Sequence, residues 1–172
     1  MRPLAVAIAA AVLAVPAAER PLPEVPSAFF IAKSENRNQV HFAVAVDDRC
    51  APRGDEPVSP RWWMLEAGPG VTEPLGSWEH AAYGVASQRV LTRSAAGGSV
   101  ALSLQALPAR RLVITTSARG DGSCAATVTA HIAGANASLE SVWVELGLLH
   151  VAWIRLQGRT SEGQPISEKV SL

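Results

Sequence analysis

A dense run of polar side chains occupies residues 33–38, between two segments with strand character. Lys33, Asn36, Arg37 and Asn38 bring two cations and two amides together, and such groups can bind a carboxylate or a phosphate. Asparagine also suits tight turns, so the same residues fit a hairpin loop whose side chains satisfy their own backbone. The residues alone leave a binding site and a structural loop as alternatives.

A second polar element surrounds Glu79 and Tyr83. Residues 77–84 read Ser-Trp-Glu-His-Ala-Ala-Tyr-Gly and predict a short helix, with Ser77 as its N-terminal cap and Gly84 as a left-handed end. We expect this helix and the polar run to meet in one cleft. The residues predicted to form that binding surface are Lys33, Asn36, Arg37, Asn38, Glu79 and Tyr83.

Other chemistry has no recognisable signature. The four histidines lack the spacing of a metal site, and no serine stands in the turn that nucleophilic hydrolases use. No glycine-rich loop matches a phosphate cradle. We therefore assign no catalytic residue, metal or cofactor. The 15 basic and 15 acidic residues balance, which disfavours nucleic acid as a partner of the whole molecule.

The tryptophans allow two interpretations. An exposed tryptophan can stack on a sugar ring, whereas most tryptophans pack in a core or at its edge. Trp62 and Trp63 are neighbours in an expected strand and must point to opposite faces, so at most one belongs to the main core. Trp143 alternates with Val142 and Val144 and is expected on the face away from theirs.

Two cysteines, Cys50 and Cys124, are the candidates for a disulfide bond. An exported protein meets an oxidising compartment, where such a bond forms and persists. Sequence does not show whether the two Cα atoms come within bridging distance, so a disulfide and two separate thiols both remain open.

Apolar and polar residues alternate along most of the chain, and β-branched residues are frequent in these segments. Gly-, Pro- and Asn-containing turns separate the segments at short intervals, as in a sandwich or small barrel. The expected strands are residues 28–33, 39–46, 58–66, 85–93, 99–106, 111–117, 124–133, 141–147 and 150–157, with a possible tenth at 165–171. The predicted fold is all-β: an antiparallel β-sandwich or small barrel of about nine strands with one short helix.

The start of the chain predicts export. Arg2 precedes an uncharged apolar run that ends in small residues, which is typical of a signal peptide over residues 1–17. A buried N-terminal helix is the alternative. Residues 18–27 contain three prolines and read as an extended leader, and residues 28–172 as a single β domain without a transmembrane segment. The expected location is periplasmic or extracellular.

Several of these segments together resemble an uncharacterised bacterial family, domain of unknown function 4833. They are the strand, polar run and strand of residues 29–42, the pair Trp62-Trp63, residues 76–85, and the C-terminal Gly-Gln-Pro-Ile-Ser-Glu of residues 163–168. The chain departs from the family pattern at Glu35, where a basic or neutral residue is expected. The resemblance implies an exported, mostly β domain and implies no activity.

The function expected from these observations is a non-catalytic binding or interaction module of the cell envelope. Its partner would be a small molecule or an envelope protein. One alternative is a carrier of a small apolar or lipid-like ligand, which predicts an interior cavity lined by Val, Leu and Trp. Another is an envelope hydrolase in which Glu79 acts with Arg37 or Lys33.

Overall fold

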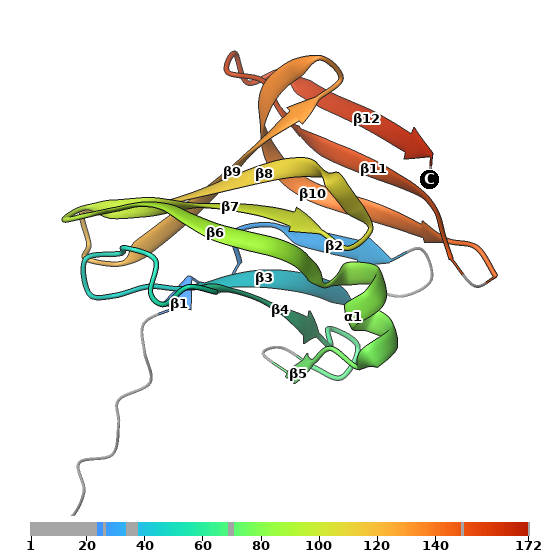
Figure 1. Cartoon of the computed structure of the whole chain (residues 1–172), viewed down its shortest axis with the longest axis horizontal. Coiled ribbons are helices and arrows are strands. Elements are labelled where there is room, and N and C mark those ends of the chain that lie inside the picture. The colour runs from blue at the N-terminus through green and yellow to red at the C-terminus, as the bar shows by residue number, and fades with distance from the viewer. Residues whose placement is uncertain (1–23, 26, 34–37, 69–70, 149, 172) are drawn as a thin grey trace, which may run out of the picture.

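The computed structural model describes residues 24–25, 27–33, 38–68, 71–148 and 150–171. The predicted signal peptide and most of the predicted leader lie outside these residues. In chain order the strands are β1 (Glu24–Val25), β2 (Phe30–Lys33), β3 (Gln39–Ala45), β4 (Val58–Trp63), β5 (Thr72–Pro74), β6 (Val85–Ser94), β7 (Gly97–Leu104), β8 (Leu107–Ala118), β9 (Cys124–Ile132), β10 (Ala135–Leu146), β11 (Val151–Arg159) and β12 (Pro165–Ser171), and the helix is α1 (Ser77–Tyr83) (Figure 1). The nearly all-β prediction is confirmed.

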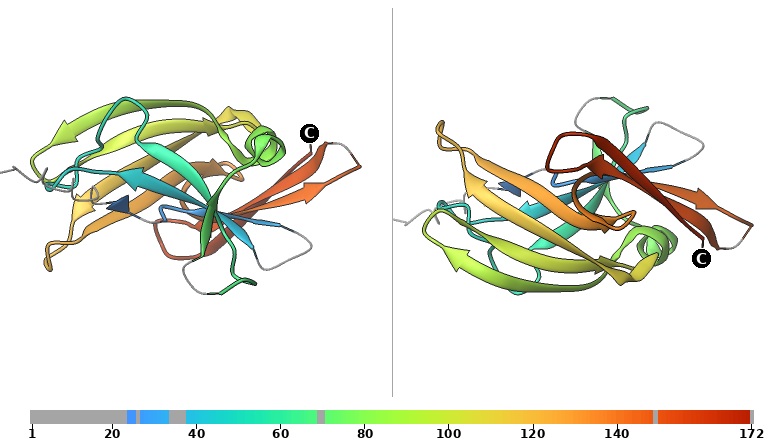
Figure 2. Two further views of the ribbon diagram at one scale, coloured as in Figure 1. Left: turned by 90° about the horizontal axis from the view of Figure 1, so that it is seen from below. Right: turned by 90° about the horizontal axis from the view of Figure 1, so that it is seen from above.

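All twelve strands belong to one hydrogen-bonded sheet with the order β5-β4-β3-β2-β10-β9-β8-β7-β6. β1 pairs with β3, and β11 leaves the path at β10 and carries β12 at its other edge. The sheet curls so that β6–β9 face β3 and β4, while β11 and β12 project as a ribbon (Figure 2). The alternating apolar residues of both layers meet in one buried cluster, which is what the period of two predicts.

β10 changes partner along its length. Its residues Ala135–Ser138 pair antiparallel with β9, whereas Ser141–Val144 pair parallel with β2. A register irregularity between Leu139 and Ser141 separates the two halves. Bulges of this kind bend a strand, and the bend frees the edge that β2 occupies. The β2–β10 pair is the one parallel pair among the described strands, where the sequence predicted an antiparallel sheet.

β6, at one end of the strand path, approaches β4 and the loop before it without forming a ladder. Gln88 of β6 donates from Nε2 to the carbonyl oxygen of Val58 in β4 (3.1 Å), and its Oε1 accepts from the Val58 amide (2.8 Å). Arg93 donates to the carbonyl oxygens of Pro52 and Gly54. These side chains satisfy backbone groups that a neighbouring strand would otherwise pair.

The helix begins and ends differently from the prediction. Gly76 is its N-cap, Ser77 is its first residue, and no side chain caps it. Gly84 ends it in an extended conformation, with φ −66° and ψ 168°, and not in the left-handed region. A Cβ at Gly84 would lie 2.3 Å from the His80 carbonyl oxygen, so close backbone contact accounts for the glycine.

Cys50 and Cys124 form a disulfide with a Cα–Cα distance of 5.4 Å. Of the two alternatives for the cysteines, the structure has the disulfide and not two separate thiols. The bond ties the β3–β4 loop to the first residue of β9. Beside it, the Thr116 hydroxyl donates to the Cys50 carbonyl oxygen at 2.7 Å.

The C-terminal ribbon is held to the sheet by a bidentate ion pair. Arg110 of β8 donates to both carboxylate oxygens of Glu168 in β12, at 2.7 and 3.1 Å, and the Ala133 amide donates to the same carboxylate. These hydrogen bonds, the one from Arg110 foremost, lower the pKa of Glu168 below its usual value. β11 runs past the expected end of its strand at residue 157 and includes Gly158.

Candidate functional site

The structure places only part of the predicted polar cleft. Asn36 and Arg37 lie outside the described residues, and Lys33 is described only as the last residue of β2. Asn38 is buried, and its Oδ1 accepts a hydrogen bond from the Glu66 amide at 3.3 Å. Asn38 therefore holds the loop that follows β4. A meeting of the polar run with Glu79 and Tyr83 stays a prediction.

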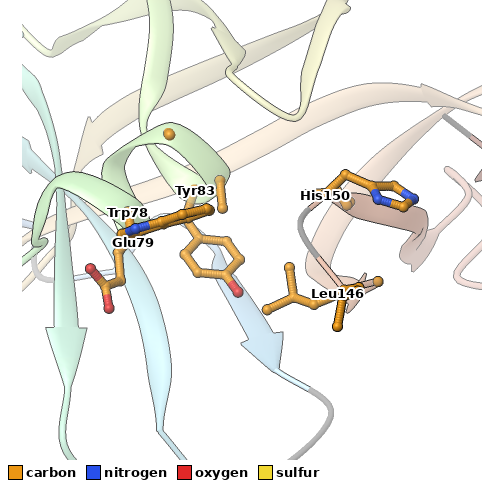
Figure 3. A pocket seen from close by; sticks show the side chains of 10 residues that line it. Trp78, Glu79, Tyr83, Leu146 and His150 are labelled. Atoms are coloured by element: carbon orange, nitrogen blue, oxygen red, sulfur yellow. The ribbon is translucent and has the colours of Figure 1, made fainter.

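Tyr83 is anchored under the helix. Its side chain is buried, and its ring meets Trp62 of β4 edge-on, with ring centroids 5.9 Å apart. Burial, and next the negative charge of Glu79, raise the pKa of Tyr83 to about 12. The phenol is therefore protonated at neutral pH. Its hydroxyl is directed towards Leu146 (Figure 3).

A groove of about 420 Å³ lies between α1 and the turn that joins β10 to β11 (Figure 3). Two elements far apart in the sequence form its walls. The lining residues are Trp78, Glu79, Ala81, Ala82 and Tyr83 from the helix, and Leu146, Gly147, Leu148, His150 and Val151 from the turn. Glu79 and Tyr83, two residues of the predicted binding surface, thus line one groove. The opposite wall is the β10–β11 turn, which the sequence did not indicate as part of a site.

The groove exposes unusually large apolar side chains. Trp78 is 71 % exposed, Leu148 94 % and Leu146 43 %. Among the described residues the other large exposed apolar side chains are Leu65 and Val71, on the connection that leads from β4 to α1. Monomeric proteins rarely leave such groups in water together, and a cluster of them marks a contact surface.

Glu79 stands at the rim of the groove. Its carboxylate lies on the side of α1 away from Leu146 and His150 (Figure 3). The predicted hydrolase pairs it with Arg37 or Lys33, whose side chains lie outside the described residues. That hypothesis stays a prediction. In the part of the chain that the structure describes, no three His, Cys, Asp or Glu side chains gather as a metal site would require.

Most of the tryptophans have neighbours against their rings. Trp62 is buried, while Trp63 points to the other face and stacks on His41, with ring centroids 4.0 Å apart. Trp153 has the Lys169 ammonium 4.3 Å from its ring centroid. Because neighbours occupy these ring faces, sugar stacking there is disfavoured. Trp78 is the tryptophan that stands out into solvent.

Leu146, Leu148 and His150 were not singled out from the sequence. The two-sided apolar pattern of residues 142–156 is a signal for them, because such a pattern suits a strand covered on both faces or a contact surface for another subunit. It did not indicate that the end of this hairpin faces α1.

Comparison with known proteins assigns the chain to a family. No curated protein and no solved structure matches it. No described helix has the length and apolar character needed to cross a bilayer. The family model described as "Domain of unknown function (DUF4833)" matches residues 29–169, which is most of the chain. The protein therefore belongs to the DUF4833 family.

Proposed function

We propose that this protein is an exported, non-catalytic binding module whose contact site is the groove between α1 and the β10–β11 turn. The observation that carries the proposal is the exposure of Trp78, Leu146 and Leu148 around one hollow. The export-type start of the chain and the disulfide both suit an oxidising envelope compartment.

The groove is built for contact with an apolar group. Burying one large apolar side chain contributes about 1.5–3 kcal/mol, so three of them contribute at most about 9 kcal/mol, which is comparable with the lower part of the estimated cost of association, about 4–15 kcal/mol. Tyr83 and Glu79 add polar groups at the edge of the apolar walls. Such a balance, mostly apolar with few polar groups, is typical of recognition sites.

A carrier of a small apolar ligand is the second candidate, because about 420 Å³ falls in the range of small-molecule sites. This groove lies at the surface between two elements, whereas the carrier hypothesis expected an interior cavity. The volume and the apolar lining of the groove suit a small apolar ligand as well as they suit a docked side chain of a partner protein.

The test is a fluorescence titration of the mature chain with the neutral apolar dye phenylnaphthylamine. We expect saturable binding that Trp78→Ser and Leu148→Ser each weaken about tenfold, since each removes apolar area worth about 1.5 kcal/mol or more. Leu65→Ser is the matched control, because Leu65 is also exposed and does not line the groove. Equal binding by all four proteins, or none by the wild type, would refute the proposal.

A further inference from the structure

The surroundings of the groove carry negative charge. Between Arg61 and Arg89 the sequence has Glu66, Glu73 and Glu79 and neither lysine nor arginine. The helical wall and the connection leading to it come entirely from this stretch. The opposite wall, from Leu146 to Val151, also lacks lysine and arginine.

One of these carboxylates lines the groove, and a second lies on the face of the sheet that α1 covers. Glu79 lines it directly. Glu73 of β5 is the cross-strand partner of Trp62, and the ring of Trp62 contacts Tyr83 under the helix. Cross-strand partners share a face of the sheet, so Glu73 lies on the α1 side of β5. The negative charge of Glu79 also acts inside the groove, where it contributes to the raised pKa of Tyr83.

The described lysine and arginine side chains of the C-terminal ribbon are not among the residues that line the groove. Lys169 and Arg155 lie against the ring of Trp153, at 4.3 and 5.3 Å from its centroid. Arg159 pairs with Glu140, and Arg110 with Glu168. The described lining of the groove thus contains one carboxylate, that of Glu79, and neither lysine nor arginine.

We infer that the occupant of the groove is a basic amphipathic segment of a partner protein, with apolar side chains between α1 and the β10–β11 turn and lysine or arginine opposite Glu73 and Glu79. This inference rests on the proposed binding function. An amphipathic helix lying in an apolar groove is a common recognition mode, and charge complementarity selects the partner.

The same charges disfavour two other occupants. A second copy of this chain docked through the same face would bring like carboxylates together. An anionic lipid surface would meet the same repulsion, whereas membrane-docking surfaces are usually rich in lysine and arginine.

The test uses two synthetic peptides with the same leucine spacing, one with lysine and one with glutamate at every polar position. We expect the lysine peptide to bind the full mature chain at least about tenfold more tightly than the glutamate peptide at low salt. That preference should shrink at high salt, because screening weakens contacts between exposed charges. Fluorescence anisotropy of the labelled peptides measures both affinities.

Variants that remove carboxylates test whether Glu73 and Glu79 cause the tighter binding of the lysine peptide. Glu79→Gln together with Glu73→Gln should reduce lysine-peptide affinity about threefold to tenfold. Glu140→Gln is the control, because Glu140 carries the same charge and pairs with Arg159 on the β10–β11 ladder, outside the groove lining. It should leave peptide binding unchanged.

Several results would overturn the inference. Equal affinity for the two peptides would do so, as would an unchanged lysine-peptide affinity in the Glu73 and Glu79 variant. Binding of phosphatidylcholine vesicles through Trp78 as tight as that of the lysine peptide would point to a membrane instead. Self-association of the chain that Leu148→Ser abolishes would point to a second copy of the chain. If the dye still binds with dependence on Trp78 and Leu148, only the basic partner is wrong. If the dye does not bind either, the proposed function fails as well.

Discussion

His41 shows how one polar residue is made part of a packed surface. Its ring lies between Phe30 and Trp63, with centroid distances of 5.5 and 4.0 Å. Nε2 donates to Gln39 Oε1 at 2.9 Å, which leaves Nδ1 to accept from the Ser27 hydroxyl at 2.7 Å. Burial lowers the pKa of His41 to about 4, so the imidazole is neutral at neutral pH.

This lowered pKa predicts acid sensitivity. The unfolded chain binds a proton at His41 below about pH 6.5, whereas the folded chain resists protonation down to about pH 4. The stabilising contribution is therefore complete above pH 6.5 and falls as the pH drops towards 4. We expect His41 to account for at most about 2 kcal/mol of stability lost between pH 7 and pH 5.

Urea denaturation of His41→Phe at both pH values checks this. The variant loses two hydrogen bonds, so its absolute stability falls, but its pH dependence between 7 and 5 should become shallower. His131→Phe is the control, because His131 is exposed on another strand. An unchanged slope in His41→Phe would contradict the assignment.

At the scale of elements, the bend in β10 depends on a close approach to β11. Gly158 of β11 pairs with Leu139 at the register irregularity. A Cβ at Gly158 would lie 2.1 Å from the Ser138 carbonyl oxygen and 3.2 Å from the Leu139 Cα. Both contacts are with backbone, which cannot rotate away as a side chain can. The glycine thus permits the close pairing of β10 with β11, and the turn between these strands forms one wall of the groove.

We expect Gly158→Ala to lower the free energy of unfolding by roughly 1–3 kcal/mol, the usual cost of forcing extra volume into a packed site. Gly120→Ala is the matched control, because nothing lies within 4 Å of a Cβ there. Thermal unfolding followed by circular dichroism compares the two variants. Equal stability of both would show that the backbone around β10 relaxes freely.

At the scale of the molecule, the disulfide bridges 74 residues of chain separation. It joins the β3–β4 loop on one layer to the start of β9 on the other. Closing so long a loop removes much of the entropy of the unfolded chain, worth about 4 kcal/mol in the chain-entropy account. Gln88 and Arg93 bridge the seam of the open sheet near the same end of β4.

The double variant Cys50→Ser with Cys124→Ser should therefore lose about 3–4 kcal/mol of stability in urea denaturation. The wild-type protein treated with a reducing agent is the control and should lose a similar amount. If reduction leaves the midpoint of the wild type unchanged, the bond is absent from the protein in solution.

Local structure could be read from the sequence to a large extent. Alternation placed β12 at residues 165–171 and β6 at 85–93, where the structure has Pro165–Ser171 and Val85–Ser94. It separated Trp62 from Trp63 correctly, because neighbouring residues of a strand must face opposite ways. The short strands β1 and β5 were missed, since two or three residues are too few to show a period.

The partners of each segment could not be read in this way. The sequence by itself determined the longer strands, the short helix, the family and the faces on which residues alternate, because these depend on neighbours in the chain. Only the tertiary structure decided that β10 pairs with β2, that Cys50 meets Cys124, and that the β10–β11 turn faces α1. Periodicity specifies which way a side chain points, whereas these contacts join segments about 60 to 110 residues apart and depend on how the whole sheet bends.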